Sequence, residues 1–422
     1  MNDQCLTPSV SILIVNYNGK KYLKNLFKSI LEQSYSDFEI LFFDNDSQDH
    51  SLDYLKDKIL TSSRLKDVTS IFQSTKNLGF AKPNNQMSKI AKGKYLLFIN
   101  NDMFLHKNAL SNMIKVIQKN YFIAGVAPKI YLSKYLPMKI FDSVGICMDR
   151  SGSPYNRGIG QIDLGQYDYE EEVLGPCFAC CLIKKDLFLQ NGGLDSSYFA
   201  YFEDVDWDFR TRKEGYLFYS SPKAISFHLH SGTSNRQSYA WKYRLIFRNY
   251  LRTVMKTFGK RSSMRIIVCK INDLVSVMVN SKTPREIKIT ISKILVNFIF
   301  VDWWLYGLRR PNNRKYFINE IADEELFRFG DWEPSEFFNP ETYKSDINLS
   351  MLDFIVMRKN NFQVNEKMVG TWQKMKKSFY CAVPNKLWKE KFDKFVSMYL
   401  NSHLRKKELD SISDSLFSTR LK

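Results

Sequence analysis

Acidic, amide and imidazole side chains recur directly after apolar runs of this sequence that have the composition of strands. Asp44 follows residues 38–43, Asp102 follows residues 95–99 after two asparagines, and His228 ends the run that begins at residue 224. Carboxylate oxygens and imidazole nitrogens are ligands for divalent cations in proteins. A carboxylate can also accept a proton from an attacking hydroxyl group. Side chains of these types could therefore serve a site that binds a metal ion or one that activates a hydroxyl group.

A second group of charged and aromatic side chains lies between residues 197 and 212 and contains the adjacent pair Glu203 and Asp204. Either carboxylate could act in acid–base chemistry. The alternative is that they are acidic residues in the first turn of a helix, where they favour the positive end of the helix dipole. We assign that alternative role to Asp206 and Asp208.

The elements that would position these groups alternate along the first hundred residues. Apolar, β-branched runs at 10–15, 38–43, 70–73 and 95–99 predict buried strands, and the intervening segments 20–33, 50–60 and 83–92 predict helices. This alternation predicts an α/β fold with a mostly parallel sheet. Because ligands bind beyond the carboxyl ends of such strands, we expect Asp44, Asn77 and Asp102 to converge.

The character of the chain changes after about residue 235. Residues 241–258 predict a basic helix, and residues 266–279 and 287–308 predict strongly apolar helices. We therefore expect a catalytic domain at 1–235, a basic and apolar helical segment at 236–312, and a C-terminal extension of unknown role at 313–422.

Five ordered sequence blocks carry a resemblance to a known family. They are Val15-Asn-Tyr-Asn-Gly19, Asp44-Asn-Asp-Ser47, Asn77-Leu-Gly-Phe-Ala-Lys-Pro-Asn-Asn85, Phe98-Ile-Asn-Asn-Asp102 and Tyr201-Phe-Glu-Asp-Val-Asp-Trp207. Over about residues 9–235 the chain resembles an inverting family 2 glycosyltransferase with a GT-A fold, and in particular its rhamnosyltransferase-like branch. Each block alone is weak, and the order of all five gives the resemblance its strength.

The resemblance implies a binding site for a nucleotide-sugar donor. Asn16, Tyr17 and Asn18 would line the base, and Asp44 would accept hydrogen bonds from the base or ribose. A local turn is the alternative role for Asp44. The same resemblance places four further residues beside the donor: Asn77, Gly79, Asn85 and Asn101.

The resemblance also implies a divalent metal, Mg²⁺ or Mn²⁺. Asn100-Asn-Asp102 stands where the family has its D-x-D motif, so Asp102 would be the ligand, and a helix cap is the alternative. His228 is expected as a second ligand, with His230 as the alternative that the sequence leaves open.

The implied reaction is a single displacement with inversion. Asp204 would be the general base, and Glu203 would orient the acceptor or its loop. The expected enzyme is a hexosyl- or deoxyhexosyltransferase that uses a dTDP- or UDP-sugar and a glycan or lipid-linked acceptor in the synthesis of cell-surface polysaccharide.

Composition limits the other function classes. The net charge of +18 indicates an anionic partner. No nucleic-acid motif accompanies it, so nucleic-acid binding is disfavoured. A noncatalytic nucleotide-sugar-binding or scaffold protein remains the main alternative, against which Asp44, Asp102 and Asp204 together argue.

The chain is expected in the cytoplasm, because its first residues are polar and its seven cysteines are scattered. Residues 173–184 are apolar and predict a strand. Cys177 and Cys180 form a C-x-x-C pair within it, for which a structural role is favoured over zinc or redox chemistry. Trp303 and Trp304 beside Arg309 and Arg310 allow a second location, peripheral on an anionic membrane face. The alternative is that the apolar helices pack within the protein or on another subunit.

Overall fold

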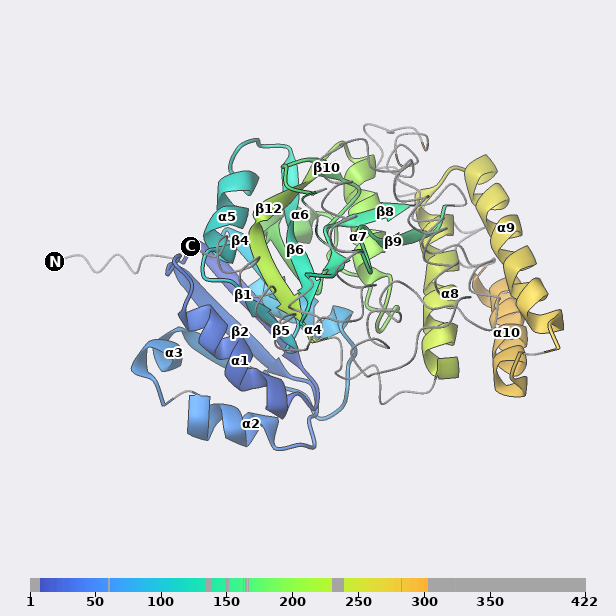
Figure 1. Cartoon of the computed structure of the whole chain (residues 1–422). Helices are drawn as coiled ribbons and strands as arrows, with labels where there is room; N and C mark the ends of the chain where they lie inside the picture. Colours follow the sequence, from blue (N-terminus) through green and yellow to red (C-terminus); the bar gives the residue numbers. More distant parts are fainter. Residues whose placement is uncertain are drawn as a thin grey trace, which may run out of the picture.

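The computed structural model describes residues 8–59, 61–133, 139–148, 152–161, 163, 165, 167–229, 239–281, 283–302, 323 and 326. The described part of the chain consists of a central sheet with helices on both faces and a group of three helices to one side (Figure 1).

One half of the sheet is parallel and is built from the first hundred residues. Its strands are β1 (Val10–Asn16), β2 (Phe38–Asp44), β3 (Thr69–Gln73) and β4 (Tyr95–Ile99). β1 pairs in parallel with β2 and with β4, and β2 pairs in parallel with β3. The intervening helices are α1 (Lys20–Leu31), α2 (Ser51–Tyr54) with a π-helical continuation (Leu55–Ile59), α3 (Ser63–Val68) and α4 (Ala81–Ile90).

The other half of the sheet mixes directions. Its strands are β5 (Met103–Leu105), β6 (Ile123–Leu132), β7 (Phe141–Ser143), β10 (Glu172–Val173), β11 (Cys180–Lys184) and β12 (Leu217–His228). The main sheet runs in the order β10-β12-β6-β11-β4-β1-β2-β3, with β5 paired to β12 and β7 to β6. β12 and β6 are parallel, whereas β11 is antiparallel to both neighbours. The predicted α/β fold with a mostly parallel sheet is confirmed, with antiparallel additions in this half.

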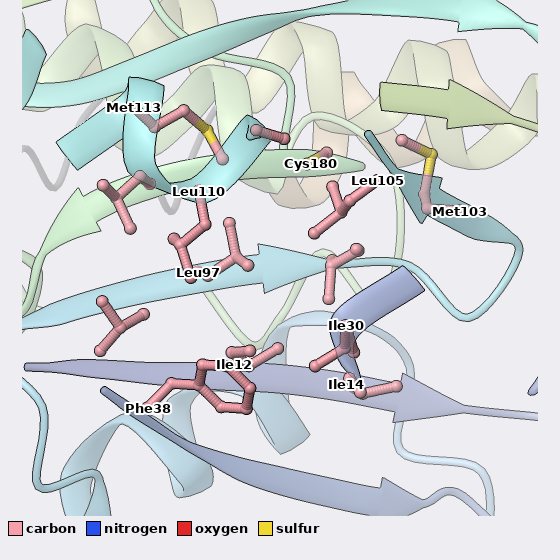
Figure 2. Close-up of a cluster of buried hydrophobic side chains, with 14 of the residues drawn as sticks. Ile12, Ile14, Ile30, Phe38, Leu97, Met103, Leu105, Leu110, Met113 and Cys180 are labelled. Atoms are coloured by element: carbon pink, nitrogen blue, oxygen red, sulfur yellow. The ribbon is translucent and has the colours of Figure 1, made fainter. Parts of the chain in front are cut away.

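Two apolar cores cover the two faces of the sheet. Alternate residues of β1 divide between them, because successive side chains of a strand point to opposite faces. Ile12 and Ile14 pack toward α1, α3 and α5 (Ala109–Ile117), and Figure 2 shows them beside Leu97 of β4 and Leu110 of α5. Leu13 faces α4, α6 (Lys185–Gln190) and α7 (Glu203–Lys213) on the other side.

A third core joins the last helices to the rest of the molecule. These helices are α8 (Tyr239–Thr257), α9 (Lys260–Val279) and α10 (Arg285–Asn297). Their buried residues pack against Ile146 of β8 (Ile146–Met148) and against Val205 and Phe209 of α7. β8 pairs with β9 (Pro154–Asn156) in a separate two-stranded sheet. In Figure 1 α8 lies nearest the sheet, and α9 and α10 lie beyond it.

Two predicted elements differ from the structure. The strand expected at 173–184 is divided into β10 and β11, because Gly175-Pro176 interrupts the run and proline has no N–H for a ladder. The helix expected at 287–308 begins at Arg285, leaves α-helical geometry after Asn297 and continues as π-helix to residue 302. Its predicted end lies outside the described residues. Among the described helices, none is long and apolar enough to cross a membrane.

Candidate active site

Three side chains predicted to bind the donor meet at the ends of β1, β2 and β4. Asn16 and Asp44 are partners in the register of β1 and β2, and Asn16 Nδ2 donates to Asp44 Oδ1 at 3.1 Å. Asn101 Nδ2 donates to Asn16 Oδ1 at 2.8 Å. All three side chains are buried, so their polar groups form a connected network that is oriented before any ligand arrives.

The loops around this network fix its geometry. Asp44 Oδ2 accepts from the Ser47 backbone N–H at 3.1 Å, so the local turn considered for Asp44 is also present. Asn18 has a φ of 53° and joins the two loops, because its N–H donates to Ser47 Oγ and its Oδ1 accepts from the N–H of Gln48. Tyr17 lies half-exposed beside them.

Gly19 is required by the same network, although it was not among the predicted site residues. A Cβ at this position would lie 2.1 Å from Asn101 Nδ2 and 2.4 Å from Asn16 Oδ1. Only glycine leaves space for the contact between these two amides. The available signal in the sequence was its place at the end of the first block.

Asn77 and Gly79 are held by Asn45, a buried residue that the prediction did not include. Asn45 Nδ2 donates to Asn77 Oδ1 at 3.0 Å and to the Gly79 carbonyl at 2.9 Å. Gly79 has a φ of 79°, which favours glycine, and a Cβ there would lie 2.3 Å from the Phe199 carbonyl oxygen. The loop of the third block therefore packs against the loop that precedes α7.

Asn85 uses its amide group within the protein. Its Nδ2 donates to the Leu194 carbonyl at 2.6 Å, and its Oδ1 accepts from the Leu194 N–H at 2.9 Å. These bonds hold α4 to the turn that contains Gly193. Its role in donor binding stays a prediction.

Asp102 and His228 come together because β12 pairs with β5. His228 is the register partner of Met103, which follows Asp102 directly. His228 Nε2 lies 3.2 Å from Asp102 Oδ1, and His228 Nδ1 lies 2.7 Å from Asp142 Oδ2. Asp142 in β7 was not predicted, and no motif around it signals a site. His230, the alternative ligand, lies outside the described residues.

Burial alone would lower the pKa of His228, but its hydrogen bonds to Asp102 and Asp142 raise this pKa to about 10. The two carboxylates therefore favour positive charge at this point. Asp142 also fixes the ring, so that Nε2 faces Asp102, as an outer carboxylate does for many metal-binding histidines.

This donor set fits a divalent cation that shares its coordination with a ligand. Within the described residues, no group of three or more His, Cys, Asp or Glu side chains forms a metal-binding cluster. Asp102 and His228 supply one oxygen and one nitrogen, and Mg²⁺ typically completes such a site with water and substrate phosphates.

Glu203 and Asp204 open α7. Asp204 accepts hydrogen bonds from the N–H groups of Val205 at 2.8 Å and Phe178 at 3.4 Å. Burial raises the pKa of Asp204, and these backbone bonds oppose the rise. Burial and then the charge of Asp204 raise the pKa of Glu203 to about 8. Glu203 is thus mainly neutral at pH 7, and the backbone hydrogen bonds favour the ionised form of Asp204.

Cys177 relates this pair to the histidine site. Burial raises the pKa of its thiol, and the charges of Asp204 and Asp142 add to the rise, so both carboxylates lie near it. The next residue, Phe178, donates to Asp204, and the Ala179 carbonyl accepts from the Asn100 N–H. Cys180 is buried in β11, as the structural interpretation predicted, and both cysteines are free.

Of the two other acids of α7, Asp206 lies in the first turn of the helix, as predicted, whereas Asp208 lies beyond it. Asp206 is fully buried and pairs with Arg210 and Lys256. The Asp208 carboxylate has no hydrogen-bond partner among the described residues and lies against Gly175, where a Cβ would be 2.0 Å from it. Burial and the charge of Asp204 raise the pKa of Asp208 well above its usual value, which favours the protonated form of this carboxyl group. Trp207 is core, as expected.

Part of the sheet and its loops are similar to a known family. Residues 11–190 match the model of glycosyl transferase family 2. Four of the five sequence blocks and the donor-side network lie within this matched region. The Glu203–Asp204 pair, His228 and α8 lie beyond its end.

Relatives agree with this match. The chain is 23% identical over 270 residues to the low-salt glycan biosynthesis hexosyltransferase Agl10 of Haloferax volcanii, covering 61% of this chain and 79% of that protein. It is 26% identical over 140 residues to the processive diacylglycerol beta-glycosyltransferase of Mycoplasma genitalium, covering 31% of this chain and 40% of that protein. For that protein and two other curated relatives, from Haemophilus influenzae and Bacillus spizizenii, the matched region spans less than half of the relative.

A solved structure supports the fold. The crystal structure of GalNAc-T7 with UDP, GalNAc and Mn²⁺ aligns with a TM-score of 0.50 at 14% identity, over 74% of this chain and 58% of that one. The GT-A fold is confirmed, and the family match and the relatives support a glycosyltransferase role.

Proposed function

We propose that this protein transfers a sugar, with inversion, from a nucleoside-diphosphate donor to a hydroxyl group of a glycan or lipid-linked acceptor. The observation that carries the proposal is the position of Asp204 at the start of α7, next to the Phe178 N–H, while the strand-end network and the Asp102–His228 pair lie on loops of the same sheet. Cell-surface polysaccharide is the proposed product, and dTDP- or UDP-sugars, including dTDP-rhamnose, are the proposed donors.

The chain's own groups divide the chemistry. Asn16, Asp44 and Asn101 present fixed polar atoms to the base and ribose, so binding needs little reorganisation. Asp204 takes the proton of the acceptor hydroxyl group. At the same time the hydroxyl oxygen of the acceptor forms a bond to C1 of the sugar, and the bond between C1 and the diphosphate oxygen breaks. A Mg²⁺ or Mn²⁺ ion held by Asp102 and His228 would supply positive charge to the leaving diphosphate. The GalNAc-T7 structure, which has a similar fold, contains Mn²⁺ and supports the choice of a divalent cation.

A screen of nucleotide sugars against glycan and lipid-linked acceptors, scored by release of nucleoside diphosphate, tests the activity. Asp204→Asn should keep donor binding and lose turnover by about 10²–10⁴-fold, the usual contribution of a general base. Asp186→Asn, an exposed acid on α6, is the matched control and should keep turnover. Normal turnover in Asp204→Asn would remove this residue from the mechanism.

The metal is tested separately by binding. Asp102→Asn should weaken the affinity for UDP or dTDP in the presence of Mg²⁺ or Mn²⁺ and change it little in the presence of a chelator. An unchanged affinity with metal would place the cation elsewhere. A protein that binds the nucleotide sugar but transfers nothing to any acceptor would instead be a noncatalytic binding protein.

We also propose that the outer face of the helical segment lies on an anionic membrane. The outer face is the exposed stripe of α9, α10 and the π-helical turn that follows α10, whose apolar residues are Met264, Val268, Val275, Val279, Ile289, Val296, Ile299 and Phe300. On α9 this stripe is opposite the buried residues Ile266, Ile267 and Leu274, so the helix is apolar on both sides. A surface helix with only water outside would be polar there.

Charge supports lipid as the occupant of the outer face. Arg261 and Arg265 on α9 and Arg285 and Lys293 on α10 are exposed beside the apolar residues. Each basic residue near an anionic surface contributes roughly 1 kcal/mol of attraction. An interfacial position of this kind would bring a lipid-linked acceptor close to the enzyme.

Flotation with vesicles tests this surface. The protein should float with vesicles of anionic lipid at low salt and less with zwitterionic vesicles, and Val279→Ser with Phe300→Ser should weaken flotation. Tyr121→Ser, which removes an exposed aromatic residue between α5 and β6, is the matched control. If the wild-type protein does not float at low salt, the outer face is covered by another part of the chain or by a second copy.

A further inference from the structure

The loop that leads into the proposed catalytic helix has an unusual backbone. Phe199, Tyr201 and Phe202 have φ values of 67°, 69° and 71°. Bulky residues avoid this left-handed region because the Cβ atom approaches the following carbonyl oxygen. Three such residues within four positions persist only where surrounding contacts determine the conformation. We call residues 197–202 the aromatic loop.

The contacts that hold the aromatic loop come from α8, in the segment beyond the region that matches family 2. Asn249 is fully buried, and its Nδ2 donates to the carbonyls of Tyr198 at 3.0 Å, Ala200 at 3.0 Å and Tyr201 at 2.7 Å. The two hydrogens of one NH₂ group are thus shared among three carbonyl oxygens of a single loop.

A neighbouring residue orients that amide. Arg248 Nε donates to Asn249 Oδ1 at 3.0 Å, which leaves the NH₂ group facing the loop. Arg248 also donates to the Tyr198 carbonyl at 3.1 Å. One turn further along α8, Thr253 Oγ1 lies 3.0 Å from the hydroxyl oxygen of Tyr198. α8 therefore contacts both the backbone and a side chain of the loop.

The other side of the aromatic loop contacts the predicted donor loop. The Phe199 carbonyl accepts from the Phe80 N–H at 2.6 Å and lies where a Cβ of Gly79 would be. The loop ends at Phe202, and Glu203 and Asp204 follow directly as the first residues of α7. Its conformation therefore sets the position of Asp204 relative to the donor side of the site.

We propose that Asn249 is a positioning residue that holds the strained aromatic loop and thereby places Asp204 for transfer. This inference rests on the proposed function, and it makes α8 a part of the catalytic unit. Asn249 itself touches no reacting atom. Its effect passes through the three carbonyl groups to the first turn of α7.

The test compares Asn249→Ala with Thr257→Ala, a control on the same helix. Thr257 is also buried, and its hydroxyl has no hydrogen-bond partner among the described residues. Asn249→Ala should lower kcat of the folded protein by about a hundredfold, the scale of loss for a ~1 Å misplacement, with little change in the Kd for the nucleotide. Thr257→Ala should keep kcat.

A second variant separates positioning from general destabilisation. Glycine adopts positive φ without strain, so Phe199→Gly should restore part of the kcat that Asn249→Ala loses. Two results would overturn the proposal: wild-type kcat in Asn249→Ala, or a loss that Phe199→Gly leaves unchanged.

Hydrogen exchange reports on the loop even if no transfer activity is found. The amides of residues 199–205 should exchange faster in Asn249→Ala and keep wild-type protection in Thr257→Ala. Equal protection in the two variants would refute the role of Asn249, whereas selective loss of protection without any sugar transfer would count against the proposed function alone.

Discussion

At the scale of single residues, Glu203 and Asp204 differ in how their carboxyl groups are satisfied. Asp204 accepts two backbone N–H groups, whereas Glu203 Oε2 is buried with no hydrogen-bond partner in the described part of the chain. Burial and the charge of Asp204 raise the pKa of Glu203 from 4.5 to about 8. Between about pH 4.5 and pH 8, Glu203 therefore keeps its proton in the folded protein and loses it in the unfolded chain.

The sign of the pH dependence follows from this proton. Because the native state binds more protons than the unfolded state between the two pKa values, this site loses stability as pH rises from about 4.5 to about 8. Glu203→Gln has no proton to release. Its melting temperature relative to wild type should therefore increase from acidic to mildly alkaline pH, whereas exposed Glu32→Gln should show no such trend. Parallel pH profiles for Glu203→Gln and wild type would contradict the assignment.

Gly19 provides a second prediction at this scale. Gly19→Ala needs no unusual backbone, but its Cβ would overlap Asn101 Nδ2 and Asn16 Oδ1. This overlap breaks the hydrogen bonds that link Asn101 and Asn16 to the Asp44 carboxylate, which should cost roughly 1.4 kcal/mol or more of binding free energy. We therefore expect the affinity for the nucleotide to fall about tenfold or more. Isothermal titration with UDP and dTDP measures this. When Gly19→Ala is introduced into the Asn101→Ala protein, it should lower the nucleotide affinity by less than it does in the wild-type protein. An equal loss of affinity in the two proteins would show that overlap with Asn101 is not the cause.

At the scale of elements, Lys256 connects α8 to α7 and to the turn before the aromatic loop. Its Nζ lies 2.7 Å from Asp206 Oδ1 and 2.9 Å from Asp195 Oδ2. Burial alone would raise the pKa of Asp195, but the charge and hydrogen bond of Lys256, together with hydrogen bonds from Ser197, lower this pKa to about 2. Asp206 is fully buried, so loss of Lys256 leaves part of its charge without compensation.

Lys256→Met should therefore lower the free energy of unfolding by about 2 kcal/mol, less than the full cost of breaking a buried pair because Arg210 still contacts Asp206. Lys270→Met is the comparison, since Lys270 pairs with exposed Asp273 on α9 and such pairs contribute about 0–1 kcal/mol. Urea denaturation measures both. If the two variants lose the same free energy of unfolding, the ion pair between Lys256 and Asp206 does not stabilise the contact between α8 and α7.

At the scale of the whole molecule, the helices after residue 238 share a core with the sheet domain. Leu251 and Val254 of α8, and Phe258 directly after this helix, pack in the same cluster as Val205 and Phe209 of α7. An interface that is continuous with a domain core does not separate at low cost. We expect residues 8–302 to unfold in one calorimetric transition, and a separate early transition for α8–α10 would contradict this. The predicted boundary at residue 235 stays a prediction.

The sequence by itself determined the parallel half of the sheet and the polar residues at its strand ends. Local rules suffice there, because a buried parallel strand reads as a continuous apolar run and its end is marked by asparagine, aspartate or glycine. For this reason Asp44, Asn77 and Asp102 could be predicted to converge on one edge. The same rules overextended the strand at 173–184, where Gly175-Pro176 breaks the ladder.

Only the tertiary structure decided which residues support that edge. Asp142 orients His228 from 86 positions away, and Asn249 holds the Tyr198 and Tyr201 carbonyls from 51 and 48 positions away. Neither residue lies in one of the five blocks, because a hydrogen bond across such separations leaves no periodicity or spacing in the sequence. Asp206 and Asp208 show the same limit: their local sequence indicates helix-end charges, whereas burial against Lys256 and Gly175 gives each a different environment.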